Sequence, residues 1–381
     1  MSIRDQSGRG GAANNADAKA DASADPLHDL YALPVGTLPT RGARRASPCP
    51  VCHGTLVTDR FTVATEEARA DGLYSLIECS ACGHGRLDPT PTPDAIRAFY
   101  PDHYYGRPGT KFRPAIEGLV RFVGRRHVRF LTRGLAPGAK VLDVGCGRGV
   151  LLGPLADEGL QAHGFELSEE AARGADARAE IRIGEDLRSA GYAEASFDLV
   201  VIWHVLEHLT EPRATLEEIR RVLRPGGRLV VAVPNYASWQ ARWSGAAWFH
   251  LDLPRHLHHF TAAGLERLIK EVGFRPRSAH HFSLRQNPFG WIQSALNRLE
   301  SLPRNQLYAV LHNRADASAT DAPAATPSRS ARLLQLTLFA LLAPISLFLT
   351  IFATAARQGG TVHFVAERVD AESNQDAPLK R

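Results

Sequence analysis

The sequence predicts an α/β protein whose main domain is a mostly parallel sheet, preceded by a small cysteine-rich module and interrupted late by an apolar helical insertion. Three observations favour this fold class. Apolar runs alternate with helical patterns between residues 136 and 284, as in successive βαβ units. Two close cysteine pairs precede them, and 24 consecutive uncharged residues, 333–356, lie near the end of the chain.

Composition narrows the class of protein only slightly. A chain of 381 residues has room for a small domain, a larger one and disordered sequence. The net charge of +5 is a mild excess that suits anionic surfaces, and no nucleic-acid-binding signature accompanies it, so we expect no nucleic-acid partner. Residues 1–45 are rich in Gly, Ala, Asp and Asn and lack the apolar core of a signal peptide, which predicts a disordered start and a cytoplasmic protein.

The cysteine-rich module, residues 46–90, predicts a zinc ribbon. In "CPVC" and "CSAC" the two-residue gap lets both sulfurs of a pair reach one tetrahedral metal, and four thiolates would fill a structural site. A β-hairpin is expected between the pairs. A disulfide-bonded or redox module is the alternative, disfavoured by a reducing cytosol. His53 and His84 lie beside the pairs and are expected to be neighbouring or surface residues. The predicted ligands are Cys49, Cys52, Cys79 and Cys82.

A helical linker or lid is expected over residues 91–135, followed by the most informative motif of the chain. The segment "KVLDVGCGRGVLL", residues 140–152, predicts a Rossmann-like strand, glycine-rich turn and helix start, where a ligand can approach the backbone and free N–H groups. The next strand ends in Glu166, about 20 residues further on, where a carboxylate binds ribose hydroxyls. A third strand ends in Asp186, at the expected adenine edge.

A fourth strand is expected from Asp198 to Trp203, then a helix over 212–223, a turn at "RPGG" and a fifth strand at "RLVVAVPN". The segments "VLDVGCGRG", "FDLVVIWHVLEHLTEP", "EIRRVLRPGGRLVVAVPN" and "WFHLDLPRHLHHFTAAGLERLIKEVGF" resemble class I S-adenosylmethionine-dependent methyltransferases. The branch they resemble includes ubiquinone-biosynthesis O-methyltransferases and sugar C-methyltransferases. The resemblance implies a seven-stranded sheet whose antiparallel last strand lies between the fifth and the sixth. The sixth strand would then be 274–284 and the seventh 359–369, within core segments 136–284 and 359–370.

The resemblance also implies which residues hold S-adenosylmethionine. The glycine turn approaches the methionine part of the cofactor, whose amino group Asp143 contacts. Glu166 takes the ribose hydroxyls, Leu187 flanks the adenine beside Asp186, and His204 faces the sulfonium. Cys146 is expected to be a small buried member of the turn rather than a nucleophile. The expected cofactor residues are Asp143, Gly145, Cys146, Gly147, Glu166, Asp186, Leu187 and His204.

Candidates for a catalytic base follow from the chemistry. Methyl transfer from a sulfonium is a direct displacement, so alignment dominates and a base is needed only if the acceptor loses a proton. The run "FHLDLPRHLHHF" follows the fifth strand, where the loops of this fold form the acceptor pocket. His256 is the first candidate for the base and His204 the second. The alternative is that His256 bonds to the backbone and closes the pocket.

The segment "HVLEH" places His204, Glu207 and His208 on one side of an expected helix. Ubiquinone-type relatives carry a carboxylate at the first position, and some hold a divalent metal with this set. The histidine found here puts that role in doubt. The alternative is that Glu207 and His208 brace the helix.

An insertion, residues 285–358, separates the sixth and seventh strands. A single membrane crossing would leave the seventh strand on the wrong side of the bilayer, so residues 333–356 must return to the side they left. Pro344 can bend the segment, which predicts a re-entrant hairpin or an in-plane helix. A buried core helix or a dimer interface is the alternative. A first insertion helix should lay an apolar face on the membrane, formed by Trp291, Ile292, Ala295, Leu296 and Leu299.

These features predict an S-adenosylmethionine-dependent methyltransferase with a structural zinc. We expect it at the cytoplasmic face of the inner membrane, acting on a lipid, a quinone or a lipid-linked sugar. Two other functions are compatible with the sequence: a soluble sugar-nucleotide C-methyltransferase, and a non-catalytic scaffold that keeps the cofactor fold. The tail, residues 371–381, is expected to be disordered.

Overall fold

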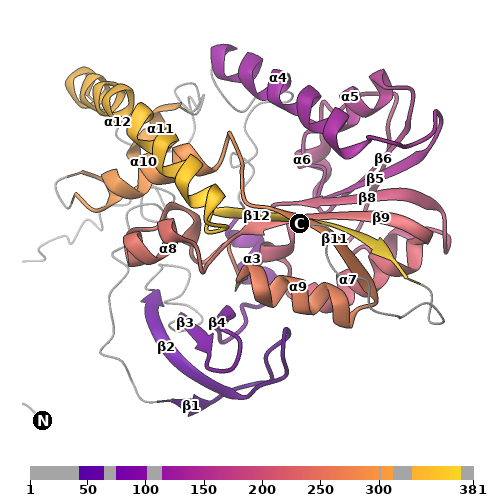
Figure 1. Cartoon of the computed structure of the whole chain (residues 1–381), viewed down its shortest axis with the longest axis horizontal. Coiled ribbons are helices and arrows are strands. Elements are labelled where there is room, and N and C mark those ends of the chain that lie inside the picture. The colour runs from indigo at the N-terminus through magenta and orange to yellow at the C-terminus, as the bar shows by residue number, and fades with distance from the viewer. Residues whose placement is uncertain (1–42, 64–73, 101–113, 300–301, 312–327, 370–381) are drawn as a thin grey trace, which may run out of the picture.

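The computed structural model describes residues 43–63, 74–100, 114–299, 302–311 and 328–369. The tail that was expected to be disordered lies outside these residues, as do nearly all of the expected disordered start and part of the expected lid. The described chain forms one large sheet, a smaller ribbon sheet beneath it, and a group of helices at one end (Figure 1).

Seven strands form the large sheet in the order β11-β12-β9-β8-β5-β6-β7. The strands from β5 to β9 pair in parallel, whereas β12 pairs antiparallel with both β9 and β11. This confirms the predicted sheet with its antiparallel last strand between the fifth and the sixth. The strands are β5 (Lys140–Val144), β6 (Gln161–Glu166), β7 (Glu180–Ile183), β8 (Phe197–Trp203), β9 (Leu223–Pro234), β11 (Phe274–His280) and β12 (Thr361–Arg368).

Helices cover both faces of this sheet (Figure 1). Alternate residues of β8 divide between two apolar cores: Leu199 and Val201 face one core, and Val200 and Ile202 face the other. Burial on both faces is why the central strands read as continuous apolar runs. The first core is shared with α4 (Pro114–Leu131) and α5 (Leu152–Asp157), and the second with α7 (Pro212–Val222) and α9 (Ala262–Glu271). Two shorter helices, α6 (Glu169–Ala172) and α8 (Trp239–Ser244), follow β6 and β9.

Two strand boundaries differ from the predicted ones. The sixth strand, β11, ends at His280 rather than at residue 284. The expected "RPGG" turn lies inside β9, whose pairing with β8 skips from Leu223 to Arg228. Gly226 has a φ of 68°, so the skipped residues can bulge out of the ladder while the strand continues.

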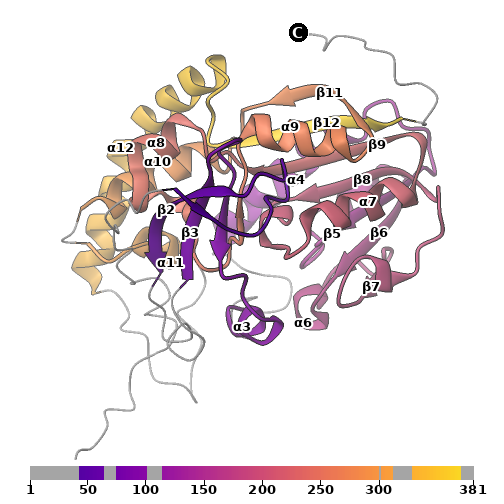
Figure 2. The same cartoon turned by 90° about the horizontal axis from the view of Figure 1, so that it is seen from below.

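The ribbon sheet has the order β1-β2-β3-β4-β10. Strands β2 and β3 form the hairpin predicted between the cysteine pairs. The last strand, β10, comes from the later segment 136–284 and pairs with β4. Figure 2 shows β2 and β3 of the ribbon sheet beside each other. The sheet begins at Arg44, slightly before the predicted boundary, and a short helix, α3 (Pro93–Ala98), follows it. Its strands are β1 (Arg44–Arg45), β2 (Leu56–Val63), β3 (Tyr74–Cys79), β4 (Gly85–Asp88) and β10 (His258–His259).

The insertion forms α10 (Asn287–Asn297), α11 (Gln306–Leu311) and α12 (Arg329–Ala355). Helix α12 continues through Pro344, so the re-entrant hairpin is not formed. A proline removes one helical hydrogen bond and can bend a helix without ending it, and α10 and α11 pack along α12 here.

The expectation that α10 lies on a membrane is wrong. Trp291, Ile292 and Leu296 are buried, and the last two share a small core with α11 and with Leu338 and Phe339 of α12. The apolar face of α10 therefore has a partner within the protein, which its own sequence could not reveal.

Candidate active site

The glycine turn connects β5 to the helix that follows it. Gly145 and Gly147 have positive φ angles of 72° and 49°. A side chain at Gly145 would also collide with Val205, so this position requires glycine. Cys146 between them is buried, and burial raises the pKa of its thiol, which keeps it neutral. This environment supports a packing role for Cys146.

Glu166, at the end of β6, holds the turn in place. Its Oε2 accepts a hydrogen bond from the backbone N–H of Gly147 (2.8 Å), and its Oε1 accepts one from Leu167 (2.8 Å). A carboxylate has about four acceptor sites, so lone pairs remain for hydroxyl donors. After β7, Asp186 Oδ1 accepts a hydrogen bond from the Ser189 N–H (2.8 Å). The structure thus brings the predicted carboxylates to the carboxyl ends of neighbouring strands.

Asp143, in β5, is a buried carboxylate without a donor. Its side chain is 5% exposed, and no hydrogen bond or ion pair reaches it from the described part of the chain. Burial and the nearby charge of Glu166 raise its pKa to about 8. A buried acid that has no protein partner suits a positively charged ligand, because that ligand would supply the missing compensation.

His204 follows β8 in the left-handed region, with a φ of 56°. Its Nδ1 lies 3.2 Å from Glu207 Oε1, and its buried Nε2 has no partner within the described residues. Burial and the positive charge of Arg285 lower its pKa to about 3, so the ring is neutral. With the Nδ1 proton donated to Glu207, Nε2 presents a free lone pair.

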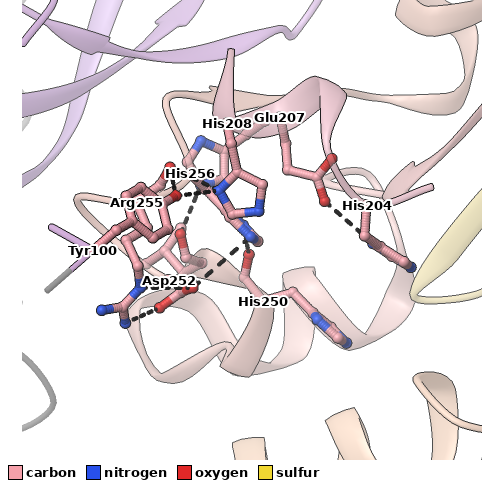
Figure 3. A network of polar contacts seen from close by, with 10 residues as sticks. Tyr100, His204, Glu207, His208, His250, Asp252, Arg255 and His256 are labelled. Atoms are coloured by element: carbon pink, nitrogen blue, oxygen red, sulfur yellow. Dashed lines mark hydrogen bonds and ion pairs between the residues drawn. The ribbon is translucent and has the colours of Figure 1, made fainter. Parts of the chain in front are cut away.

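The expectation that "HVLEH" forms a helix with three groups on one face is wrong. Only Leu206–His208 is helical, as a single 3-10 turn, because His204 is left-handed and Val205 has a φ of −133°. The carboxylate of Glu207 points toward His204 (Figure 3). Its Oε2 is buried without a partner among the described residues, and burial raises its pKa to about 7.

His208 is held by groups that come from distant parts of the chain. Its Nδ1 lies 2.8 Å from the hydroxyl of Tyr100 and 3.0 Å from the carbonyl oxygen of Arg255 (Figure 3). Tyr100 follows α3, and no motif in the sequence marked it as part of this site. Arg285, which influences His204 electrostatically, was also missed because it lies in an irregular polar stretch after β11.

The histidine-rich loop, residues 248–260, also lies close to Glu207, because His256 of this loop offers an atom within 4.8 Å of the Glu207 carboxylate. Arg255 Nη2 donates to Asp252 Oδ1 (2.6 Å), which fixes the centre of the loop. His256 is buried, and its Nδ1 lies 2.9 Å from the carbonyl oxygen of His250. This contact supports the alternative expectation that His256 closes the pocket. Burial, followed by the neighbouring His208, lowers the pKa of His256 and keeps it neutral.

The cysteine cluster fits a zinc ion. Cys49 Sγ lies 3.7 Å from Cys82 Sγ, Cys52 Sγ lies 3.5 Å from Cys79 Sγ, and all four sulfurs lie within 4.8 Å of one another. Tetrahedral coordination with Zn–S bonds of about 2.3 Å places sulfurs about 3.8 Å apart. The four cysteines are free in this arrangement, and the sulfur separations suit metal coordination rather than disulfide bonds of about 2.05 Å.

A second set of possible ligands lies in the site itself. Glu207, His208 and His256 each offer an atom within 4.8 Å of the other two. A carboxylate and two imidazoles are a common ligand set for divalent transition metals. His204 is not part of this set. The predicted group of His204, Glu207 and His208 is therefore replaced by a group in which His256 of the histidine-rich loop takes the place of His204.

The strand order, the glycine turn and the carboxylates at the strand ends define a methyltransferase-like protein that binds a nucleoside cofactor. Residues 116–279 match the family described as a methyltransferase domain. An uncharacterized methyltransferase of Mycolicibacterium gilvum is 31% identical over 188 residues, which cover 48% of this chain and 68% of that protein. A ubiquinone biosynthesis O-methyltransferase of Thiobacillus denitrificans is 30% identical over 187 residues, 45% of this chain and 78% of that protein. The chain belongs to the S-adenosylmethionine-dependent methyltransferases.

The chain also resembles solved structures at low sequence identity. A phosphoethanolamine N-methyltransferase of Haemonchus contortus in complex with S-adenosyl-L-methionine has 18% sequence identity and a TM-score of 0.43. That match covers 74% of this chain and 59% of the other. The residues described above fit the cofactor, because Asp143, with which none of the described residues pairs, offers a counter-charge to a cationic group near the end of β5. Glu166 offers acceptors for ribose hydroxyls at the neighbouring strand end.

Proposed function

We propose that this methyltransferase works at the cytoplasmic face of a membrane and methylates an acceptor that resides there: a lipid, a quinone or a lipid-linked sugar. Helix α12 carries this proposal. It is the one helix in the described ranges that is long and apolar enough to cross a membrane, and only 17% of its most apolar window is buried.

The polarity of α12 is reversed relative to a helix of a soluble protein. Its buried side includes the polar residues Gln335, Ser346 and Thr350. Its outward side is apolar, with Leu341 64% exposed and Phe348 60% exposed. Such an arrangement is costly in water and favourable in lipid. The buried residues recur along the whole length of the helix, which supports a helix lying in the plane of the membrane rather than across it.

The same insertion contacts the histidine-rich loop directly. The backbone N–H of Phe249 donates to Ser294 Oγ of α10 (2.9 Å), and the ring of Phe249 lies 5.2 Å from that of Phe289. Asn297 Nδ2 donates to the carbonyl oxygen of Ala247 (3.2 Å). An acceptor delivered along α12 and α10 would therefore arrive beside the loop and His204.

The residues of the site support a simple mechanism for the transfer. S-adenosylmethionine supplies a methyl group on a sulfonium, and the glycine turn, Asp143 and Glu166 hold and orient it. The His204 ring is neutral, and its Nε2 has no partner among the described residues, so Nε2 can remove the proton if the acceptor is a hydroxyl, while Glu207 orients the ring through Nδ1. His256 closes the pocket from the loop side and excludes water. Thiobacillus denitrificans carries a relative named as an O-methyltransferase, which favours transfer to oxygen.

Vesicle flotation tests the membrane proposal. The wild-type protein should float with vesicles of phosphatidylethanolamine and phosphatidylglycerol and should stay bound at high salt, because apolar burial is not screened. The variant Ile345→Glu/Phe348→Glu should remain in solution. Leu56→Glu, at an equally exposed leucine of the ribbon, is the matched control and should float. Flotation of the double variant would rule out α12 as the membrane-binding element.

Thiol labelling tests the orientation. The flanks of α12 should both face the cytoplasm because β12 begins only a few residues after the helix and pairs with β9. Cysteines introduced at Ser328 and Ala356, the residues that directly flank α12, should resist a membrane-impermeant reagent in intact cells and react after lysis. Labelling of one site from outside would establish a membrane crossing and contradict the in-plane arrangement.

A soluble sugar-nucleotide methyltransferase is the second candidate from the sequence, and the reversed polarity of α12 argues against it. A second copy of the chain covering the same face would make this candidate viable again. Sedimentation of the protein without detergent, combined with the flotation assay, distinguishes the soluble enzyme from the membrane-associated one. Only the soluble enzyme is expected to form a dimer that does not bind vesicles.

A further inference from the structure

The zinc ribbon and the histidine-rich loop form one continuous structure. Strand β10 of the loop is the last strand of the ribbon sheet, with His258 opposite Arg86 and His259 opposite Gly85. The ladder is extended by a hydrogen bond from the N–H of Leu87 to the carbonyl oxygen of Leu257 (3.0 Å). Sequence segments that lie about 170 residues apart thus share backbone hydrogen bonds. Without β10, the outer edge of β4 would have no strand to pair with, and without β4, β10 would have no sheet to join.

Apolar side chains join the two parts as well. Leu76 and Leu87 of the ribbon share a buried core with Trp248, Leu251 and Leu257 of the loop. These three loop residues are almost fully buried, although the loop has little regular secondary structure of its own. Loops with few internal hydrogen bonds depend on such contacts for order.

His84 links the metal cluster to the loop. It lies two residues after Cys82, is fully buried, and its Nε2 lies 3.1 Å from Nδ1 of His258. The two rings stack at an interplanar angle of 24°, and the His84 ring lies 4.7 Å from the ring of Phe260. The turn that carries His84 is the one that the second cysteine pair closes, so the metal would fix its position.

We propose that the zinc ribbon is a positioning element of the acceptor site: the thiolate cluster holds β4 and His84 where they order the histidine-rich loop, while the cofactor site remains independent of it. The residues that hold His256, Asp252 and Arg255 in place belong to this loop. Asp143 and Glu166 belong to β5 and β6, and the hydrogen bonds that Glu166 accepts come from residues 147, 167 and 168 rather than from the ribbon. This inference rests on the proposed placement of the acceptor beside the loop. A protein that has lost its metal should still bind S-adenosylmethionine but should no longer present an ordered acceptor site.

Hydrogen exchange of the full-length protein tests the proposal through His84→Ala, which leaves all four thiolates in place. Exchange in residues 248–260 should become faster by about tenfold or more, as expected for loss of local order, while exchange in residues 140–166 stays unchanged. Zinc content and the dissociation constant for S-adenosylmethionine should stay within about twofold of wild type. His53→Ala is the matched control, because His53 also follows a cysteine pair but its side chain is 62% exposed.

Metal removal provides a second route. Cys52→Ser is preferable to a change at Cys49 or Cys79, since those two are fully buried in the main core and Cys52 is only partly buried. The expected result is again fast exchange in the loop with calorimetric binding of S-adenosylmethionine preserved. Unchanged loop exchange in both variants would show that the loop is ordered without the ribbon. Equal acceleration in residues 140–166 would show general destabilisation. Either result would overturn the proposal.

Transfer of label completes the test. Membranes from cells that lack this protein are incubated with enzyme and S-adenosylmethionine tritiated on the methyl group, and label in the lipid extract is counted. His84→Ala should lose most of the transfer while retaining the cofactor affinity of the wild type. If wild-type enzyme transfers no label to lipids, the proposed acceptor class is wrong, and the exchange experiment still decides the coupling between ribbon and loop.

Discussion

Replacing Asp143 by asparagine should make the cofactor-free protein more stable and its cofactor binding weaker. Asp143 is buried in β5 without a donor among the described residues, and burial together with Glu166 raises its pKa to about 8 from an ordinary 3.8. Between these two values the unfolded chain has an ionised carboxylate, while the folded protein retains the proton. The unfolded state therefore binds fewer protons, and stability falls as the pH rises through this window.

The magnitude follows from the width of the window. One pKa unit corresponds to 1.36 kcal/mol, so at pH 7 the difference of 7 − 3.8 = 3.2 units costs the folded state about 4 kcal/mol. At pH 5 the difference is 5 − 3.8 = 1.2 and costs about 2 kcal/mol. Asparagine has the same shape and no charge. The gain in unfolding free energy for Asp143→Asn should approach these values and be larger at pH 7 than at pH 5.

Urea unfolding of the cofactor-free protein at the two pH values measures this gain, and calorimetry with S-adenosylmethionine measures the loss of affinity. Asp252→Asn is the control with the opposite sign. Burial alone would raise the pKa of Asp252, but the positive charge of Arg255 holds it well below the usual range, so its ionised form stabilises the fold. Asp252→Asn should therefore reduce stability at both pH values.

Two results would refute the reasoning about Asp143. An asparagine variant that is no more stable than wild type at pH 7 would mean that the carboxylate ionises without penalty in the empty site. A gain that is the same at pH 5 and pH 7 would mean that the effect is one of packing rather than of charge. Buried histidines also make stability pH-dependent, but they are common to both proteins and cancel in the difference.

Three further predictions concern the site and the metal. Glu166→Ala should weaken S-adenosylmethionine binding by about 1–3 kcal/mol, because it removes a charged acceptor and frees the Gly147 N–H; unchanged affinity by calorimetry would remove Glu166 from the cofactor site. His204→Ala should slow turnover by about 10²–10⁴-fold with little change in cofactor affinity, and His256→Ala should have the smaller effect; the reverse order would make His256 the base. Purified protein should contain about one zinc per chain by elemental analysis, and Cys79→Ser should lose most of it.

The sequence predicted those parts of the fold that are encoded locally. The glycine turn and the carboxylates at the ends of β5, β6 and β7 could be read because strand, turn and helix follow one another within a few residues. The segment "RPGG" predicts a turn but forms a bulge. The positive φ of Gly226 is compatible with a turn and with a bulge, and pairing with β8 is what continues β9 through it.

The parts that could not be predicted depend on contacts between distant segments. Pro344 can end a helix or bend it, and the continuous course of α12 depends on its packing with α10 and α11. The sequence pattern of the apolar face of α10 is the same whether lipid or another helix covers that face, so the pattern cannot distinguish the two. Tyr100 reaches His208 across more than a hundred residues of chain, and the spacing of "HVLEH" suggested a helix because the left-handed backbone of His204 has no signature in the sequence.

The position of β12 has a consequence for how the protein is made. This strand lies between β9 and β11, and on a ribosome it is the last described element to emerge. The nascent chain must therefore keep a gap between two strands until β12 has emerged. Helix α12 emerges just before β12, while that gap is still open. If α12 binds a membrane as proposed, its apolar side can meet the bilayer before the sheet closes. A stop codon placed after α12 would leave β9 and β11 without the strand that joins them, so the large sheet could not close.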